Sequence, residues 1–438
     1  MSPAPASDPL GKPPVTAAPP RHNPWPFVLT LSFASAFPNA ASSSLAALFY
    51  KSLGYSNEIV GYTGLLFIPF AASFLWAPWV DRTASKRAWL LGLTWALAGA
   101  FGVLAATIEC WGPLLGLTLA VITLIAVLGA TAELSMNGYF LHALDQQQQA
   151  AISGFRTAAI RVGGIFAGGL LLKVCADYGA ARGDVADGWV LLFGVLAVAF
   201  AVSGAYHSWV LPRPVTDRPA PVTTDGGSHR RVWAEFRRVP GVGLVVAFFL
   251  IYRFGEGLLV RMVGPFLLDP PAKGGMGYTV ADVAFMQGTV GVVCSMAGGI
   301  LGGWLIKSHG LRRMAFPLAL ALTLPHVPYV WLAWYGGSTL MVQACIAIEA
   351  FGYGMGFSTM FMLMVVLGRG EYRASLAAIC TGLWSVGWLV PIFFSGLIQA
   401  HVGYFWLFLL SVVTALPGLA LVRFLPLAKL EAGAARTD

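Results

Sequence analysis

The sequence of 438 residues is 57% hydrophobic and only 11% charged, whereas soluble globular proteins carry about 25% charged residues. This composition excludes a soluble globular protein and indicates an integral membrane protein. The formal net charge is +8. A positive charge can indicate binding to nucleic acid, but in a membrane protein we expect it to reflect basic loops on one side of the bilayer. No nucleic-acid partner is therefore predicted.

The chain opens with a segment that is rich in Pro, Ala and Ser, residues 1–24. It has no apolar core, so it is not a signal peptide, and we expect a disordered tail. Twelve apolar segments follow, each near the length of about 20 residues that crosses a bilayer. They are 25–49, 57–79, 88–108, 112–142, 150–175, 188–211, 240–268, 280–306, 314–334, 338–368, 374–399 and 403–425. The predicted fold class is an all-α integral membrane protein.

The polar, Pro-rich and basic segment 212–239 divides the spans into two groups of six. We therefore predict a first six-helix bundle over 25–211, a second over 240–425 and a short tail over 426–438. Most of the 27 Lys and Arg residues fall in the two tails, the central linker and the loops on the same side. Since basic loops stay in the cytoplasm, both termini are predicted to be cytoplasmic.

The loops after the second and eighth spans, 81-DRTASKR-87 and 307-KSHGLRR-313, echo each other weakly. Parallel repeats of six spans are typical of the major facilitator fold, whose loop motif resembles G-x-x-x-D-R-x-G-R-R. Here Asp81 and Arg82 match this motif, Lys86 and Arg87 resemble its basic pair one residue further along, and its first Gly is absent. We predict that Asp81, Arg82 and Arg87 form a cytoplasmic gate between the halves. The alternative is that they anchor the topology in the lipid headgroups.

Several ionisable residues lie inside the apolar spans. A charge at the centre of a bilayer costs about 2.5–3.5 kcal/mol on insertion scales, so such residues are expected to have water, partners or a task. We therefore predict a hydrated central cavity. The residues are Glu133, Arg156, Arg161, Arg253, Glu256, Arg261, His326 and Glu349.

The stretch 251-IYRFGEGLLVR-261 places three charges in the seventh span. Arg253 and Glu256 are neighbours on one helical face. A carboxylate beside a guanidinium can exchange that partner for a proton or an anionic ligand; the alternative is a purely structural ion pair. We predict proton coupling at Glu256, and at Glu133 and Glu349 on the fourth and tenth spans.

Solute binding is predicted for residues that offer planar hydrogen-bond donors, amides or aromatic faces. Guanidinium groups suit carboxylate and acetamide oxygens. Trp384 and Trp388 lie four residues apart, a spacing more often found in packing than in solute stacking. His326, between two prolines, is expected to mark a kink or line the pathway. The predicted solute-binding residues are Arg161, Arg253, Arg261, Asn137, Tyr252 and Trp384.

Longer motifs carry a resemblance that extends over all twelve spans. The segment 74-FLWAPWVDR-82 looks like the F-L-W-A-P-x-x-D-R signature of AmpG-type muropeptide permeases, a group that also includes acetyl-CoA transporters and some siderophore permeases. The segment 32-SFASAFP-38 is similar to the family's G-F-x-S-G-L-P. The segments 252-YRFGE-256 and 265-PFLL-268 resemble its Y-K-x-G-D and P-F-L-L.

The resemblance implies proton-driven import of an amino sugar, disaccharide or muropeptide-like solute across a bacterial inner membrane. Glu133 and Asn137 occupy the positions of the family's D-x-x-x-D pair, so only the first is ionisable here. Ser73 replaces a Lys of the family, which implies a different or less anionic solute. The expected partners are a small solute, protons and the bilayer. We expect a monomer without a cofactor.

Three other functions fit the sequence less well. A siderophore or CoA-like anion would suit a basic cavity, but additional clustered bases are missing. A membrane-embedded transferase would need a catalytic set, and His142 and Asp145 are accompanied by no nucleophile elbow, phosphate loop or metal spacing. A sensor without transport usually carries a soluble output domain. The five cysteines form no CxxC pair, so no metal site is predicted.

Overall fold

The computed structural model describes residues 23–144, 146–219, 236–237, 239–367, 373–428 and 430. Within these residues the chain is helical and contains no strand. Nearly all of the predicted N-terminal tail lies outside the described residues. Residues 220–235 and 238 of the linker, and the last eight residues of the chain, do as well.

The first half of the chain folds into helices that often change winding within one span. Local signals set several boundaries: the Ser85 hydroxyl accepts from Ala88 N and begins α6, and Gly112 ends it at a φ of 74°. The elements are α1 (Trp25–Ala40), η1 (Ala41–Leu45), α2 (Ala46–Ser52), α3 (Asn57–Tyr62), η2 (Thr63–Phe67), α4 (Ile68–Ala72), η3 (Ser73–Leu75), α5 (Ala77–Thr83), α6 (Lys86–Trp111), α7 (Leu115–Ala143), α8 (Gln146–Ile165), η4 (Phe166–Leu171), α9 (Leu172–Arg182) and α10 (Val185–Val210).

Helices of the second half also change winding within single spans. Thr279 and Asp282 form a reciprocal capping box where α14 begins. The elements are α12 (Val242–Ile251), α13 (Phe254–Leu268), η5 (Pro271–Lys273), α14 (Val280–Val283), η6 (Ala284–Gly291), α15 (Val292–His309), α16 (Leu311–Thr323), η7 (Leu324–His326), α17 (Val327–Tyr335), α18 (Thr339–Leu367) and α19 (Arg373–Phe424).

Among the described residues, ten helices are long and apolar enough to cross a bilayer. One of them, Ile379–Phe424, contains the eleventh and twelfth predicted spans, because Gly403 interrupts it at a φ of 79°. The helical run 25–52 has the length of a span but is less apolar, since it carries Asn39 and a row of serines. The chain is therefore a multi-pass membrane protein, and these two differences account for the twelve predicted spans.

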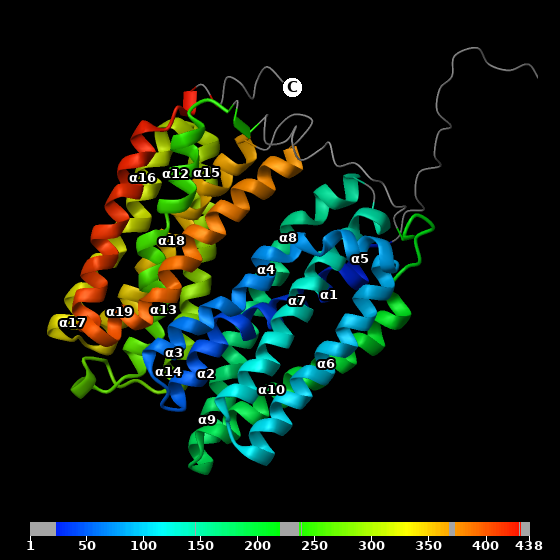
Figure 1. Cartoon of the computed structure of the whole chain (residues 1–438), viewed down its shortest axis with the longest axis horizontal. Helices are drawn as coiled ribbons and strands as arrows, with labels where there is room; N and C mark the ends of the chain where they lie inside the picture. The colour runs from blue at the N-terminus through cyan, green and yellow to red at the C-terminus, as the bar shows by residue number, and fades with distance from the viewer. Residues whose placement is uncertain are drawn as a thin grey trace, which may run out of the picture.

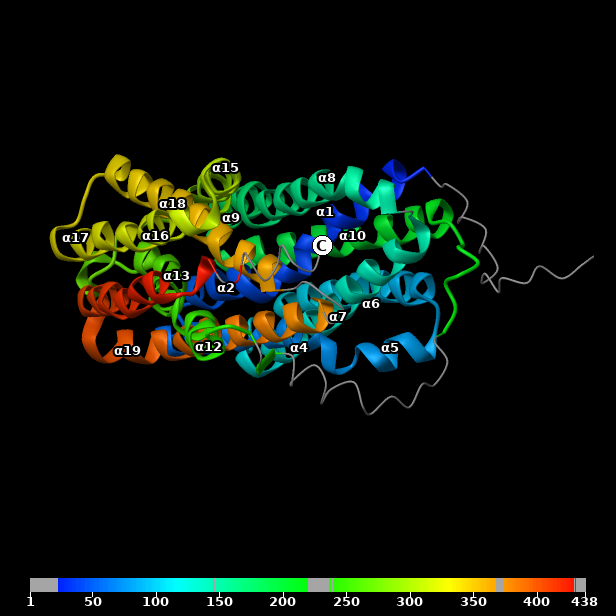
Figure 2. The same ribbon diagram turned by 90° about the horizontal axis from the view of Figure 1, so that it is seen from above.

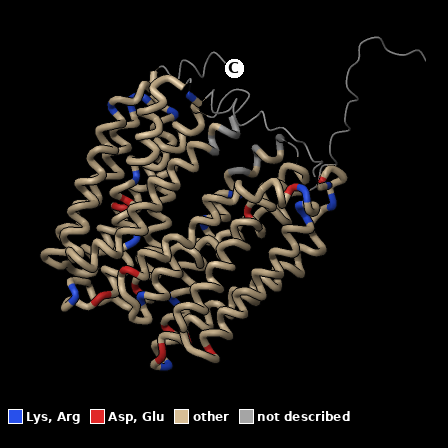
Figure 3. The backbone as a smooth tube through the Cα atoms, in the orientation of Figure 1, with Lys and Arg blue, Asp and Glu red and all other residues tan. Residues whose placement is uncertain are grey.

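The helices form two groups, one from α1 to α10 and one from α12 to α19 (Figures 1 and 2). We call the end that carries residues 212–219 the linker end, and the opposite end, where α3 and α14 lie, the closed end (Figure 1). Between the two ends the tube in Figure 3 is mostly free of charged residues. The few charges between them are therefore candidates for function.

The two halves meet mainly toward the closed end. There α3 packs on α19, η4 on η6, and α2 on α13. Glycines permit this close approach: a Cβ on Gly61 would lie 2.9 Å from the backbone N of Gly396, and one on Gly169 would lie 2.8 Å from the carbonyl carbon of Gly288. Backbones thus touch across the interface, so any side chain added at these crossings would separate the halves.

Candidate functional site

A cavity of about 500 Å³ lies between the two halves, and we call it the central cavity. Both halves contribute polar side chains to it, among them Ser35, Asn39, Ser43 and Gln287. Six of the predicted site residues also line it: Glu133, Arg161, Arg253, Glu256, Arg261 and Glu349. Residues from four spans are thereby collected in one place.

Arg253 and Glu256 form a buried ion pair at a break in the seventh span. The helix is interrupted between α12 and α13, and Arg253 stands at the break with a φ of −107°. Its Nε and Nη2 donate to the two carboxylate oxygens of Glu256. The two residues are only 3% and 2% exposed. The i,i+3 spacing predicted this neighbourhood, which satisfies both charges in the interior.

Aromatic rings enclose the same guanidinium. The Cζ of Arg253 lies 5.2–5.7 Å from four ring centroids, those of Tyr353, Phe357, Trp384 and Trp388. Such cation–π contacts stabilise a desolvated guanidinium. Trp388 lines the central cavity, while Trp384 is not among the cavity-lining residues. In this structure Trp384 therefore acts on Arg253, and stacking on a solute stays a prediction.

Three charged residues of the central cavity make no hydrogen bond or ion pair within the part of the chain that the structure describes, although the charge of Arg156 acts on Glu133 and that of Arg253 on Glu349. Glu133, Glu349 and Arg161 each line the cavity and make neither a hydrogen bond nor an ion pair there. An unpaired charge at mid-membrane is unfavourable unless water or a ligand satisfies it. These three groups are the ones left available for a proton or a solute.

Two other predicted solute-binding residues lie off the central cavity. Asn137 Oδ1 accepts from Arg156, whose guanidinium also covers the Phe140 ring at 4.9 Å. Tyr252 is buried, and its hydroxyl donates to Gly356 O at 3.1 Å. Their side chains are occupied by internal contacts in this conformation.

Arg261 joins the two halves. It belongs to α13, yet its guanidinium donates to Val60 O at 3.0 Å, to Ser43 O at 2.8 Å and to the Thr63 hydroxyl. All three acceptors belong to the first half. Arg261, which was predicted to bind the solute, therefore bonds across the interface in this conformation, in which the halves meet at the closed end.

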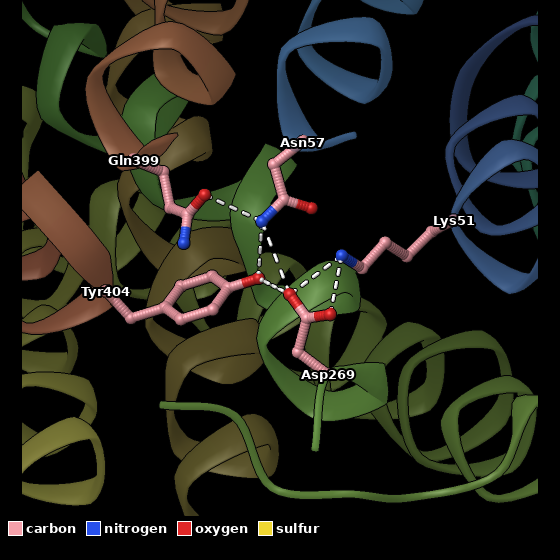
Figure 4. A network of polar contacts seen from close by, with 5 residues as sticks. All are labelled: Lys51, Asn57, Asp269, Gln399 and Tyr404. Carbon is pink, nitrogen blue, oxygen red and sulfur yellow. Dashed lines mark hydrogen bonds and ion pairs between the residues drawn. The ribbon is translucent and has the colours of Figure 1, made fainter. Parts of the chain in front are cut away.

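A second network crosses the interface at the closed end, and Figure 4 shows its five residues. Lys51 Nζ lies 2.7 Å from each carboxylate oxygen of Asp269. The Tyr404 hydroxyl donates to the same carboxylate at 2.5 Å, and Asn57 Nδ2 lies 3.3 Å from it. Asn57 also donates to Gln399 at 2.7 Å. We call these five residues the closed-end network.

The closed-end network was not predicted from the sequence. Neither Lys51 nor Asp269 was among the predicted site residues. The only signal for pairing is that both closely follow predicted spans, on the side with few basic residues. A vestibule of about 940 Å³ reaches the pair from the closed end. Lys51 and Asp269 side chains are only 9% and 7% exposed. An ion pair held this way is stronger than one on an open surface.

Asp269→Asn is expected to loosen the closed end, because the substitution leaves the buried ammonium of Lys51 without its carboxylate. Hydrogen exchange of residues 54–66 and 392–404, followed by mass spectrometry on the detergent-solubilised protein, should rise severalfold. Asp177→Asn is the matched control, since Asp177 also lines the vestibule but pairs with Lys173 in an exposed position. Equal exchange in the two variants would contradict a gating role.

Among the described residues, the hydrogen bonds and ion pairs of the predicted cytoplasmic gate stay within the first half and the linker, where Arg87 N donates to Asp217 at 2.9 Å. Asp81 pairs with Lys86, and the Arg87 guanidinium donates to Ser208 O at 2.9 Å and to Leu211 O at 3.2 Å. Arg82 is exposed. A contact between the halves here belongs to a conformation in which the linker end is shut, so this gate stays a prediction.

The family model of the Major Facilitator Superfamily matches residues 28–391. The chain belongs to this superfamily. A Haemophilus influenzae protein described as uncharacterized is 24% identical over 88% of this chain and 91% of its own length. The anhydromuropeptide permease of Escherichia coli is 23% identical over 90% of this chain and 78% of its own. A solved D-xylose–proton symporter aligns with a TM-score of 0.70 at 14% identity, covering 92% of this chain and 98% of the other.

Membership of the superfamily confirms the predicted fold class and the predicted resemblance to permeases. It also identifies the chain as a transporter rather than an enzyme, which removes the transferase alternative. The relatives are distant, so the coupling ion and the solute are matters for proposal.

Proposed function

We propose that this chain is a proton-coupled secondary transporter that imports an amino sugar, disaccharide or muropeptide-like solute across a bacterial inner membrane. One observation carries the proposal: the central cavity contains two carboxyl groups and a guanidinium that make no hydrogen bond or ion pair with any other described residue. Ionisable groups that face an interior cavity of a membrane protein typically serve ion or solute pathways. Glu133 and Glu349 are assigned to the proton, and Arg161 to the solute.

Glu349 shares the central cavity with the Arg253–Glu256 pair. A deprotonated Glu349 competes with Glu256 for the charge of Arg253, whereas a protonated Glu349 does not. Binding of a proton therefore changes which carboxylate Arg253 prefers. Because Arg253 stands at the start of α13 and both Glu256 and Arg261 lie in that helix, a change there shifts the balance between the two conformations of the protein.

The solute class follows from the size and chemistry of the central cavity. Its volume of about 500 Å³ is that of a small-molecule site. Serine hydroxyls, Asn39 and Gln287 suit the hydroxyl and amide groups of an amino sugar, and Arg161 suits a carboxylate. The name of the Escherichia coli relative supports a muropeptide-like solute, which would place part of its length outside this cavity.

The orientation is proposed from the distribution of basic residues. The linker end carries most of the Lys and Arg residues and is assigned to the cytoplasm, with both termini there. The closed end then faces the periplasm, and this conformation is one in which the periplasmic side is shut. Alternating access would rock residues 25–211 against residues 240–425.

The test is uptake into proteoliposomes that contain a pH-sensitive dye. An inward proton gradient is imposed, and GlcNAc, chitobiose and an anhydromuropeptide are added in turn. We expect acidification that depends on the solute. In Glu133→Gln and Glu349→Gln, net uptake should fall at least about tenfold, the loss expected when an essential proton site is removed. Counterflow of labelled solute should persist in at least one of them, because exchange needs no net proton movement.

Glu109→Gln is the control for these variants, since Glu109 is exposed at the end of α6. Uptake without acidification in the wild type and in both Gln variants would contradict proton coupling. Counterflow of a siderophore or an acyl-CoA, without any response to the sugars, would contradict the proposed solute class and favour the anionic alternative.

A further inference from the structure

Arg261 is a buried cation whose partners are all neutral. The residue is 8% exposed, and its three hydrogen bonds go to two backbone carbonyls and one hydroxyl. No carboxylate pairs with it within the described part of the chain. Removing a guanidinium from water without a counter-charge is costly. Arg253, eight residues earlier, has a carboxylate partner, so the two arginines of this span are held in different ways.

Irregular helix winding makes the acceptors available. Ser43 lies in η1, a π-helical turn, and Thr63 opens η2, a 3₁₀ turn that directly follows the short helix of Val60. Changes of winding disturb the regular i→i+4 ladder, so that carbonyl groups can accept other donors. Val60 O accepts from the Thr63 hydroxyl at 2.7 Å as well as from Arg261 at 3.0 Å. Such turns are often found at functional positions. The first half thus presents a preformed pocket of oxygens to Arg261.

These bonds exist only while the halves touch at the closed end, because donor and acceptors belong to opposite halves. Arg261 also lines the central cavity, as do Ser43 and Gly264. When the closed end opens, the guanidinium loses its three acceptors but stays beside the cavity. A buried cation in that position requires new acceptors.

We propose that Arg261 exchanges partners during transport. When the two halves separate at the closed end, Arg261 binds a carboxylate or acetamide oxygen of the solute. When the halves meet there, it binds Ser43 O, Val60 O and Thr63. When the halves meet at the closed end, the solute therefore loses the guanidinium of Arg261 as a ligand. The affinity of the protein for the solute is then lower in the conformation that releases it. The identity of the solute rests on the proposed function; the exchange itself rests on the geometry of Arg261.

The test compares Arg261→Gln with Thr63→Val in the full-length protein. Both variants weaken the contact between the halves, so both should raise hydrogen exchange of residues 54–66 and 392–404. Their affinities for a GlcNAc-anhydromuramyl tripeptide should change in opposite directions. Thr63→Val frees the guanidinium for the solute and should bind up to about tenfold tighter, while Arg261→Gln loses the ligand and should bind at least about tenfold weaker, as for one charge-assisted hydrogen bond.

Thr123→Val is the control, because its exposed hydroxyl bonds only to Leu119 O of its own helix. Tighter binding by both main variants would show that Arg261 is a clamp alone and overturn the proposal. If Arg261→Gln binds the solute more weakly but its hydrogen exchange is unchanged, Arg261 is a solute ligand alone, and the proposal is overturned as well. If the wild type binds no muropeptide, the proposed solute class fails, and the same comparison is made with the siderophore or acyl-CoA that counterflow identifies.

Discussion

Gly396→Ala is expected to abolish transport, whereas Gly382→Ala in the same helix should leave transport within about twofold of the wild type, the range of most surface substitutions. A Cβ on Gly396 would lie 2.6 Å from the carbonyl carbon of Asn57 and 3.0 Å from Glu58 Cα, and closer still to Asn57 O. A Cβ on Gly382 would meet no atom within 4 Å. The methyl group at 396 can be placed only if the halves separate at the closed end.

The measurement is counterflow of labelled solute in proteoliposomes, with hydrogen exchange of residues 54–66 as a second readout. Gly396→Ala should show high exchange together with lost counterflow, because an alternating-access cycle needs both conformations. Gly382→Ala controls for the effect of adding alanine to α19. Full counterflow in Gly396→Ala would mean that the halves need not approach this closely, and would contradict the role assigned to the closed end.

Arg253→Met is expected to destabilise the protein by about 3–5 kcal/mol, the usual cost of leaving a buried charge without its partner. Glu256 is 2% exposed and would have to remain charged without a counter-ion, or take up a proton. The double variant Arg253→Met with Glu256→Leu should recover most of this loss, since replacing both members of a buried pair by apolar groups is often nearly neutral. Thermal unfolding in detergent, followed by tryptophan fluorescence, measures the difference.

Lys173→Met provides the comparison for this prediction. Lys173 and Asp177 form an i,i+4 pair whose side chains are 43% and 54% exposed. Exposed pairs of this kind contribute under about 1 kcal/mol. A melting temperature of Arg253→Met that falls no further than that of Lys173→Met would show that solvent screens the Arg253–Glu256 pair. A double variant as unstable as Arg253→Met would instead assign the loss to the aromatic contacts of the guanidinium.

The two sites at the interface have different physical characters. The closed-end network joins the halves through an ion pair, Lys51 with Asp269. Arg261 joins them through neutral acceptors at the edge of the central cavity. An anionic solute competes well against neutral carbonyls, because charge-assisted hydrogen bonds are about twice as strong as neutral ones. The bonds of Arg261, which lie beside the central cavity, are thus the ones that a solute can replace.

The sequence alone determined the membrane class, the number of spans and the residues that required an explanation. These follow from local quantities: the length of apolar runs, the positions of Lys and Arg, and the cost of a charge inside a span. The i,i+3 spacing also determined that Arg253 and Glu256 are neighbours, since helical geometry fixes that distance within a turn. All six charged residues predicted to serve the proton or the solute line the central cavity.

Only the tertiary structure decided which of these charges are free. Arg161 and Arg261 look alike in the sequence, yet Arg161 has no partner within the described residues, and Arg261 bonds to three acceptors about 200 residues earlier. The pairing of Lys51 with Asp269 was equally hidden, since 218 residues separate them. A residue's partner across an interface depends on how two helices cross, and that crossing is set by the packing of glycines such as Gly61 and Gly396, which no local pattern specifies.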